Sequence, residues 1–360
     1  MRLLVWQWGR FGAGPRLAVE YAASLGAEPG VQTVLSLSRQ SETMRNGVSC
    51  DLPVDTYESL AGWARRLAFL PLAVPALARR LRALHLDGAL CAMPAPLDLL
   101  MAAALRRAGV PFGVIVHDAT VHPGDILPLQ AVLQRQLLRR AAALVTLSTH
   151  VAVQLRKQPV ARAKPMLTTA LPAFAFGPTP KPPRAHSGPL RLLSFGRLLP
   201  YKGLDLLADA IALLDPALPI EIRIVGQGPE TPLLDRLRAM PRVTVENRWV
   251  PEVDIAQLLA WSDAVILPYR EASQSGVAAA AVTARRWIVS TRIGGLAEQL
   301  ADEPLARLCD PSGPSLALAI TSLIEAPPED TNLGTRTKLG TADTLSQQLR
   351  AVFDPEFLTS

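Results

Sequence analysis

The sequence predicts an α/β protein built from two doubly wound parallel-sheet domains. Three observations predict this fold. The chain has 360 residues, which is enough for about two domains. In both halves, short apolar runs of strand-forming residues alternate with longer helical patterns, as βαβ units require. A proline-rich stretch over 172–189 separates the halves, and it favours a semi-rigid linker over a helix or a central strand.

Each strand of the first half is predicted from a short apolar run, and longer helical patterns lie between the runs. The strands are Leu3–Trp6, Thr33–Leu37, Gly88–Met93, Phe112–Val116 and Ala143–Leu147, and the helices include Pro15–Leu25, Trp63–Leu84 and Gln130–Ala142. The second half predicts strands at Leu190–Phe195, Glu221–Val225, Val243–Asn247, Ala264–Leu267, Trp287–Thr291 and Ala306–Leu308. We therefore expect domains over 1–171 and 190–335, joined by the linker 172–189. A C-terminal segment, 336–360, is expected to pack back on the first domain.

The composition excludes several classes of protein. Apolar residues make up 49% and charged residues 19%, which rules out a disordered chain. The net charge of +6 is spread along the chain, so it indicates no nucleic-acid-binding segment. Three cysteines without a CxxC spacing favour a reducing compartment over a disulfide scaffold. With no membrane-spanning run and no signal-peptide pattern, a cytoplasmic location is predicted.

A glycine-rich loop, Gly9–Pro15, follows the first predicted strand. Glycines let backbone N–H groups approach an anion, and the following helix N-terminus attracts negative charge. The loop lacks the third glycine of the dinucleotide fingerprint, and no acidic residue ends the second strand, so a nicotinamide cofactor is not favoured. Two interpretations remain. The loop binds an anion through Gly12 and Gly14, or it is a tight turn into a helix that proline begins.

Histidine and aspartate follow a strand that is predicted to be buried. His117 and Asp118 come directly after Phe112–Val116, and His122 lies five residues beyond His117. Ligands of open α/β sheets bind beyond the carboxyl ends of strands, where a histidine can exchange a proton near neutral pH. The alternative is a structural histidine of the core. The spacing does not match a helical zinc motif, so no metal is expected.

The second half contains two further candidate anion sites. Arg197 and Lys202 flank a turn after its first strand, and a guanidinium with an ammonium group suits a diphosphate. After its fourth strand, Ser275 and Gly276 are predicted to cap an alanine-rich helix. The first N–H groups of that helix would then face an anion without any charged side chain.

Four segments of the second half together resemble a known family. The chain is similar to the retaining, nucleotide-sugar-dependent glycosyltransferases of family four, the GT-B "group 1" glycosyltransferases. The segments that carry the resemblance are GRLLPYKGLDLL (196–207), IRIVGQGPE (222–230), residues 245–267, and LPYREASQSGV through IGGLAE (267–298). The resemblance is strong over 190–310 and looser over 1–149. It implies a GT-B fold, in which two Rossmann-like domains face each other across a cleft.

The resemblance also implies roles for individual residues. Arg197 and Lys202 match the pair that binds the donor diphosphate, and His117 matches a histidine near the anomeric carbon and the acceptor. Arg248 matches a residue that contacts the base. The full set of implied donor-binding positions is Gly12, Gly14, Gly196, Gly226, Arg248, Ser273, Ser275, Gly276 and Val277.

The chain departs from the family pattern at two positions. The family commonly has two glutamates where this sequence has Ser273 and Ala281, and Glu271 is two residues out of register with the first of them. In the family, the first carboxylate contacts the donor sugar and the second holds the ribose. Neither contact can therefore be assigned to a carboxylate of this segment.

The implied activity is transfer of a sugar, of the hexosyl type, from a nucleoside-diphosphate sugar to an acceptor with retention of anomeric configuration. The acceptor is expected to be a carbohydrate or a lipid-linked precursor of a polysaccharide. No metal and no cofactor besides the donor is expected, and no nucleic acid partner. Two alternatives remain: a non-catalytic nucleotide-sugar-binding or partner protein of the same fold, which the missing glutamates favour, and a nucleotide-sugar epimerase, whose catalytic carboxylates cannot be placed.

The segment Trp63–Leu84 combines arginines with many apolar residues. A basic amphipathic surface of this kind can lie on anionic lipid, which suggests peripheral contact with the inner face of a membrane. The alternative is a packed helix of the first domain, interrupted by Pro71 and Pro75.

Overall fold

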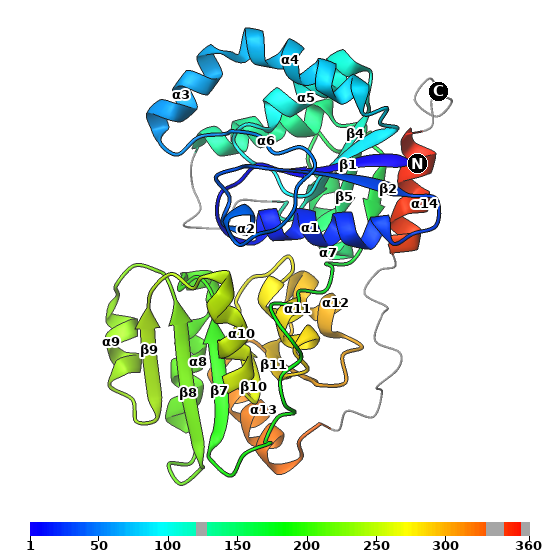
Figure 1. Ribbon diagram of the computed structural model, residues 1–360. Helices are drawn as coiled ribbons and strands as arrows, with labels where there is room; N and C mark the ends of the chain where they lie inside the picture. The colour runs from blue at the N-terminus through cyan, green and yellow to red at the C-terminus, as the bar shows by residue number, and fades with distance from the viewer. Residues whose placement is uncertain (120–127, 329–341, 354–360) are drawn as a thin grey trace. The chain divides into compact units, whose positions relative to one another are not determined.

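The computed structural model describes residues 1–119, 128–328 and 342–353, and these residues divide into two compact units. Unit 1 contains the described residues up to Pro172 together with 342–353, and unit 2 contains 173–328. Each unit has its own parallel sheet with helices packed on it (Figure 1). The α/β class with two parallel sheets is therefore confirmed, whereas the predicted domain limits stay predictions.

Unit 1 is a six-stranded parallel sheet in the order β2-β1-β3-β4-β5-β6. Its strands are β1 Arg2–Gln7, β2 Gln32–Leu37, β3 Gly88–Cys91, β4 Phe112–Val116, β5 Ala143–Thr146 and β6 Met166–Thr168. Its helices are α1 Ala13–Gly26, α2 Glu42–Arg45, α3 Leu60–Ala68, α4 Leu70–Ala83, α5 Asp98–Ala108, α6 Pro128–Arg140, α7 Thr149–Arg156 and α14 Ala342–Phe353. Figure 1 shows α4 and α5 over one face of this sheet and α1 over the other. The strands from β1 to β5 are almost wholly buried, which explains why they consist of apolar residues on both faces.

Two features of unit 1 differ from the prediction. The helical pattern Trp63–Leu84 is interrupted, as one of the two interpretations predicted, but the break falls at Phe69 and α4 continues through Pro75. Pro71 then lies in the first turn of α4, where its missing N–H group costs no helical hydrogen bond. The strand β6 was not predicted, since it is a three-residue edge strand that is only half-buried.

The last helix packs on unit 1. The Phe353 ring of α14 fills the space beside Gly88, where a Cβ atom would come within 2.2 Å of ring carbon Cδ2. Arg350 Nη2 donates a hydrogen bond to the Gly30 carbonyl at 3.0 Å. The end of the described chain is therefore held on unit 1 by a core contact between residues 265 positions apart and by an exposed hydrogen bond between residues 320 positions apart.

Unit 2 is a six-stranded parallel sheet in the order β12-β11-β10-β7-β8-β9. Its strands are β7 Leu190–Phe195, β8 Ile220–Gly226, β9 Val243–Asn247, β10 Ala264–Leu267, β11 Trp287–Thr291 and β12 Ala306–Cys309. Its helices are the 3₁₀ turn η1 Pro200–Lys202, α8 Leu204–Leu213, α9 Pro232–Arg238, α10 Glu252–Trp261, α11 Gly276–Thr283, α12 Gly294–Leu300 and α13 Gly313–Glu325. The order reverses between β7 and β10, and such a switch point opens a crevice at the carboxyl ends of the two strands.

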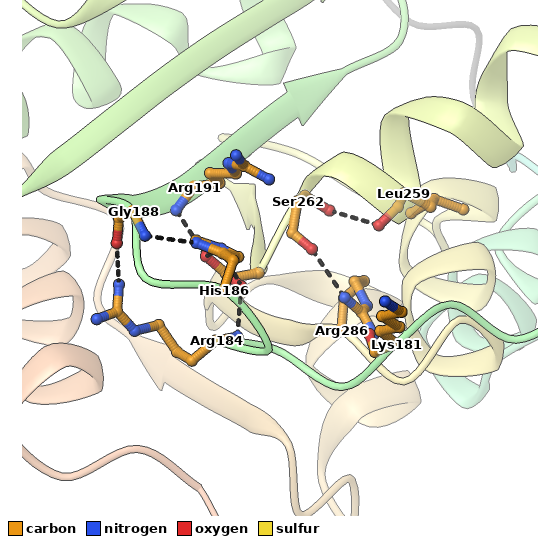
Figure 2. A network of polar contacts seen from close by, with 9 residues as sticks. Lys181, Arg184, His186, Gly188, Arg191, Leu259, Ser262 and Arg286 are labelled. Atoms are coloured by element: carbon orange, nitrogen blue, oxygen red, sulfur yellow. Dashed lines mark hydrogen bonds and ion pairs between the residues drawn. The ribbon is translucent and has the colours of Figure 1, made fainter.

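At the opposite, amino-terminal edge of this sheet, the proline-rich segment docks on the buried carboxylate of Asp263. Figure 2 shows the three residues that contact it, Arg184, His186 and Arg191. Oδ1 accepts the backbone N–H of Arg184 at 2.5 Å, and Oδ2 accepts the backbone N–H of Arg191 at 2.9 Å. His186 Nε2 lies 3.0 Å from Oδ2. One carboxylate therefore holds three groups on the approach to β7.

A second buried group, the guanidinium of Arg286, holds the same proline-rich segment near the start of β11. Arg286, just before β11, donates to the carbonyl of Ala284 at 3.0 Å. It also donates to the carbonyls of Ser262 at 2.8 Å and Lys181 at 2.5 Å (Figure 2). Burial lowers the pKa of Arg286 to about 10, and the charge of Asp263 opposes that shift. The group is therefore still charged at neutral pH.

Candidate functional site

The loops at the switch point of unit 2 approach one another closely. Gly196 directly follows β7 and has φ +121, a conformation that favours glycine. A Cβ atom on Gly226 would lie 1.6 Å from the Gly196 carbonyl oxygen, and one on Gly203 would lie 1.9 Å from the Pro268 carbonyl oxygen. Glycine is therefore required at 226 and 203 for the ends of β7, β8 and β10 to meet.

The two predicted cations lie in the turn that follows β7. Arg197 is exposed, and its Nη2 donates to the Tyr201 hydroxyl at 2.7 Å. The Lys202 Nζ atom lies 3.8 Å from the centroid of the Tyr269 ring and 5.2 Å from that of Tyr201. Aromatic faces attract cations, so the two rings hold the ammonium group in the turn after β7.

The predicted cap of the alanine-rich helix is confirmed. Ser275 is buried and is the N-cap of α11, and its Oγ accepts the N–H of Ala278 at 3.2 Å. The side-chain amide of Gln299 holds the Ser275 backbone from both sides: Oε1 accepts its N–H at 2.8 Å, and Nε2 donates to its carbonyl at 3.0 Å. The α11 N-terminus, which begins at Gly276, is thereby fixed next to the β7 turn, since a Cβ on Gly196 would lie 3.7 Å from Val277 Cγ2.

Tyr269 contacts both the Lys202 ammonium group and Ser275, the N-cap of α11. Its hydroxyl lies 3.4 Å from Ser275 Oγ, and its backbone carbonyl accepts the Thr291 hydroxyl at 2.6 Å. Burial raises the pKa of Tyr269 to about 12, so the hydroxyl stays protonated at neutral pH. The sequence analysis singled out neither Tyr269 nor Gln299. The position of Tyr269 in the sequence could have identified it as a site residue, because it lies two residues beyond the end of β10.

Arg248 follows β9 and lies beside the same loops. Its backbone N–H donates to the Gly226 carbonyl at 2.8 Å. Its guanidinium pairs with Glu246 at 2.9 Å and with Asp254 at 2.9 Å, and the hydrogen bonds to these carboxylates raise its pKa. Two carboxylates thus hold the side chain at the end of β9.

The positions that replace the two family glutamates have different environments. Ala281 lies within α11 and has no exposed surface, so a ligand cannot touch its methyl group. Ser273 is half-buried in the loop before α11, and that loop is tied to α12 by a hydrogen bond from the Gly295 N–H to the Ala272 carbonyl at 3.0 Å.

In unit 1, the glycine-rich loop folds around a buried glutamine. Gln7 Oε1 accepts the Gly9 N–H at 2.8 Å, and a Cβ on Gly14 would lie 2.5 Å from Gln7 Nε2. Gly12 has φ +82 and is the N-cap of α1. The helix therefore begins at Ala13, two residues before the proline that was expected to start it.

His117 follows β4 directly and is buried. Its Nε2 lies 3.0 Å from the Ala92 carbonyl oxygen, and a carbonyl only accepts hydrogen bonds, so Nε2 carries a proton. Burial lowers the pKa of His117, against smaller opposing contributions from the Ala92 carbonyl and Asp118. The imidazole is therefore neutral at neutral pH. His122 lies outside the described residues.

The segment that contains Ala92 is held by a carboxyl group that the sequence analysis did not identify. Asp98 is fully buried, and it accepts Trp6 Nε1–H at 3.0 Å and the Ala95 N–H at 2.6 Å. Burial raises the pKa of Asp98 to about 7, although these hydrogen bonds lower it. Through Ala95 and Ala92, Asp98 helps to position His117.

All the predicted site residues of the described chain lie at carboxyl edges of the two sheets. Gly12, Gly14 and His117 lie in unit 1, and the others lie in unit 2. Within 1–119, 128–328 and 342–353, no three His, Cys, Asp or Glu side chains gather as a metal ion would require. The helices of the same ranges include none that is long and apolar enough to cross a membrane.

Two family profiles match this chain. Residues 189–326 match "Glycosyl transferases group 1", and residues 13–168 match "Glycosyl transferase 4-like domain". The two matches correspond to units 2 and 1, and together they cover most of the sequence.

Curated relatives match over shorter segments. A GDP-mannose:glycolipid 4-beta-D-mannosyltransferase of Xanthomonas campestris is 32% identical over 108 residues, which are 28% of this chain and 30% of the relative. A glycogen synthase of Mycobacterium tuberculosis is 34% identical over 154 residues, 40% of this chain and 36% of the relative. The match thus spans about a third of the length of either relative.

Solved structures share the fold over nearly the whole chain. The Anabaena protein Alr3699/HepE, in complex with UDP and glucose, has a TM-score of 0.66 at 19% identity and covers 98% of this chain and 95% of its own. Sucrose-phosphate synthase from Thermosynechococcus elongatus has a TM-score of 0.64 at 14% identity, with coverages of 99% and 96%. The predicted GT-B fold is confirmed.

Proposed function

We propose a donor and a reaction for this chain on the premise that it belongs to the glycosyl transferases group 1. The protein transfers a glycosyl group from a nucleoside-diphosphate sugar to an acceptor, with retention of anomeric configuration. One observation carries this proposal: at the switch point of unit 2, the turn that bears Arg197 and Lys202 lies beside the fixed N-terminus of α11, with Tyr269 in contact with both Lys202 and Ser275. Two positive side chains and a helix N-terminus form a binding site for a diphosphate.

In unit 2, different residues would bind different parts of the donor. Arg197 and Lys202 bind the diphosphate, and the first N–H groups of α11, from Gly276 and Val277, reach its other oxygens. Gly196 and Gly226 let the backbone approach the nucleotide closely, and Arg248 lies where the base would contact the end of β9. Ser273 would lie near the donor sugar, to which its hydroxyl can form a hydrogen bond.

The residues of unit 1 are assigned to the reacting centre and the acceptor. His117 is neutral, so it would act near the anomeric carbon as a hydrogen-bonding group rather than as a cation. Gly12 and Gly14 give a backbone that can lie against the donor. We assign no metal and no further cofactor to the reaction.

Stabilisation of the leaving group is the main catalytic contribution that these residues can make. As the bond between the anomeric carbon and the diphosphate breaks, negative charge grows on the diphosphate while the sugar becomes oxocarbenium-like. Preorganised cations and N–H groups stabilise that charge, and removal of one such donor raises a barrier by about 3–4 kcal/mol. Fixed side chains such as Lys202, which lies against two rings, need little reorganisation during the reaction.

A direct test is release of nucleoside diphosphate that depends on an acceptor. The purified chain is incubated with UDP-, GDP-, ADP- and dTDP-sugars and a panel of simple sugars, sugar phosphates and isoprenoid-diphosphate-linked sugars. The proposal predicts that one pair gives stoichiometric nucleoside diphosphate and a product whose anomeric proton coupling matches the donor. Donor binding without any transfer would instead support the non-catalytic alternative that Ser273 and Ala281 raise, and a C2-epimerised donor would support an epimerase.

For the acceptor, we propose a carbohydrate or lipid-linked precursor of a polysaccharide that is glycosylated at the cytoplasmic face of a membrane. The outer face of α4 supports this. Phe69 and Leu72 are 55% and 72% exposed, and Arg79 and Arg80 are exposed further along the helix. Apolar and basic side chains on one exposed face suit an anionic lipid surface.

Vesicle flotation tests this contact. The wild-type chain is expected to float with vesicles that contain anionic phospholipid and to stay behind with neutral ones, and Phe69→Ser with Leu72→Ser should abolish flotation. The control is Arg106→Gln with Arg107→Gln, two exposed arginines of α5. Equal recovery of the wild type and the Ser variant would contradict membrane contact through α4.

A further inference from the structure

Three arginines from separate segments line one open pocket in unit 1. Arg10 lies in the glycine-rich loop after β1, Arg39 follows β2, and Arg45 ends α2. The pocket has a volume of about 460 Å³, and its remaining lining residues are Gln40 and Glu58. Its size falls within the usual range of small-ligand pockets, and it lies at the carboxyl edge of the sheet, where α/β proteins bind ligands.

The charge of the lining favours a doubly charged anion. Three guanidinium groups against the one carboxylate of Glu58 leave two positive charges in excess. Asp55, which is not a lining residue, lies 3.6 Å from Arg39 Nε, but both side chains are more than half exposed, so this ion pair is weak. A phosphate monoester carries about two negative charges, and planar guanidinium groups bind phosphate oxygens in pairs.

Two of the guanidinium groups are already held in position. Arg10 Nη1 donates to the Glu58 carbonyl at 2.7 Å, and Arg45 Nη2 donates to the Gln40 carbonyl at 2.7 Å. Both also lie against the Phe11 ring, with Cζ atoms 5.3 Å and 5.7 Å from its centroid. A guanidinium has five N–H groups, so one bond to a carbonyl leaves others that can reach a ligand.

The backbone around the pocket is fixed as well. The Glu42 N–H donates to the Arg10 carbonyl at 2.8 Å, which ties the glycine-rich loop to α2. Gln40 Oε1 accepts the Thr56 N–H at 2.8 Å, and this bond joins the segment after β2 to the chain that leads to Glu58. The guanidinium groups of Arg10 and Arg45 and the backbone beside Arg39 are therefore preorganised, which reduces the ordering cost of binding.

We propose that this arginine pocket binds a phosphate or diphosphate group of the acceptor substrate. The inference rests on the proposed function, since a chain that transfers no sugar has no acceptor. The donor diphosphate is already assigned to Arg197 and Lys202 of unit 2, and the arginine pocket belongs to the other unit. A sugar phosphate and an isoprenoid-diphosphate-linked sugar share the chemistry that the pocket would recognise.

Calorimetric titration of inorganic pyrophosphate tests the pocket. The full-length chain carries Arg197→Ala and Lys202→Ala, so that the site in unit 2 does not contribute. We expect pyrophosphate still to bind, and Arg39→Gln with Arg45→Gln on this background to weaken binding about tenfold or more, because hydrogen bonds between charged groups are lost. The matched control, Arg106→Gln with Arg107→Gln, removes the same charge from α5 and should leave the affinity unchanged.

Two results would overturn the proposal: no pyrophosphate binding to the Arg197→Ala, Lys202→Ala background, or equal affinity with and without Arg39 and Arg45. Failure of the proposed function is read separately, from acceptor-dependent release of nucleoside diphosphate by the wild-type chain. Retained thermal unfolding temperatures verify that the variants fold.

Glucose 1-phosphate and geranyl diphosphate, titrated into the same background, distinguish the two sources of the group. Tighter binding of glucose 1-phosphate identifies a sugar phosphate acceptor, and tighter binding of geranyl diphosphate identifies a lipid-linked one. Whichever of the two compounds binds, its affinity must fall in the variant that also carries Arg39→Gln and Arg45→Gln. If neither compound binds, the pocket does not hold an acceptor phosphate, and the proposal is wrong.

Discussion

The Lys202 ammonium nitrogen lies 3.8 Å from the centroid of the Tyr269 ring, and the Tyr269 hydroxyl reaches Ser275 Oγ at 3.4 Å. A single buried side chain thus connects the cation of the β7 turn to the cap of α11. The two parts of the proposed diphosphate site are therefore positioned relative to each other by Tyr269, which itself need not touch the donor.

Substitutions at Tyr269 should separate its two contacts. Tyr269→Phe keeps the aromatic face under Lys202 and loses the hydroxyl contact, so nucleoside diphosphate affinity should fall only a few-fold. Tyr269→Leu also loses the cation–π interaction, which contributes about 1–2 kcal/mol, and should weaken binding about tenfold more. Calorimetric titration checks this order. Equal affinities for the two variants would show that the ring does not position Lys202.

Gly226→Ala should disrupt the packing of the loops after β7 and β8. A Cβ atom would lie 1.6 Å from the Gly196 carbonyl oxygen, which is backbone and cannot rotate away. We expect a loss of about 1–3 kcal/mol in the free energy of unfolding and weaker nucleotide binding. The control is Gly62→Ala in α3, where the nearest atom is 3.5 Å away and alanine favours the helix. A Gly226→Ala variant as stable as the wild type would contradict the close packing of these loops.

Asp98 should make unit 1 less stable as the pH rises. Burial raises its pKa from the ordinary 3.8 to about 7, so between these values the native state binds more protons than the unfolded state. Its contribution to the free energy of unfolding therefore falls from about pH 4 to pH 7 and then levels off. Asp98→Asn should flatten this dependence in urea unfolding, whereas Asp55→Asn, at an exposed carboxylate, should not. Parallel pH profiles for Asp98→Asn and the wild type would refute the assignment.

The docked linker segment should become sensitive to protease when its carboxylate is removed. Asp263→Ala deprives Arg184, His186 and Arg191 of their common partner. Such bonds contribute about 1.5–3 kcal/mol, so trypsin cleavage after Arg184 should accelerate about tenfold or more. Cleavage fragments are identified by mass spectrometry, with Asp209→Ala, at an exposed partner of Arg236, as the control. Unchanged cleavage at Arg184 would mean that Asp263 does not hold the segment.

Local patterns were sufficient for most of the fold. The runs that form β4 and β10 are apolar throughout because both faces are buried, and Ser275 before an alanine-rich helix predicted its cap from side-chain chemistry alone. The strand β6 was not predicted because it has only three residues, two half-buried and one exposed, and so few residues show no periodicity. An interruption of Trp63–Leu84 by Pro71 and Pro75 was predicted, but its place at Phe69 was not, because prolines in a first turn and prolines in a helix interior look alike in sequence.

The candidate site was predicted only where its residues follow strands. Arg197 and Lys202 follow β7, so their sequence position revealed them. The hydrogen bonds of Gln299 to Ser275 and of Arg286 to Lys181 join residues 24 and 105 positions apart, and no local pattern encodes them. The arginine pocket likewise depends on the order of β1 and β2 in the sheet, which brings separate segments together.

The central claim is that Arg197 and Lys202 bind the donor diphosphate, and calorimetric titration of UDP, GDP, ADP and dTDP tests it most directly. One nucleotide should bind the wild-type chain, and Lys202→Ala should weaken that binding about tenfold to a hundredfold through loss of a charge-assisted contact. Arg236→Ala, at an exposed arginine of α9, should leave it unchanged. If the nucleotide binds the wild type and Lys202→Ala with equal affinity, the diphosphate lies elsewhere and the account of this site is wrong.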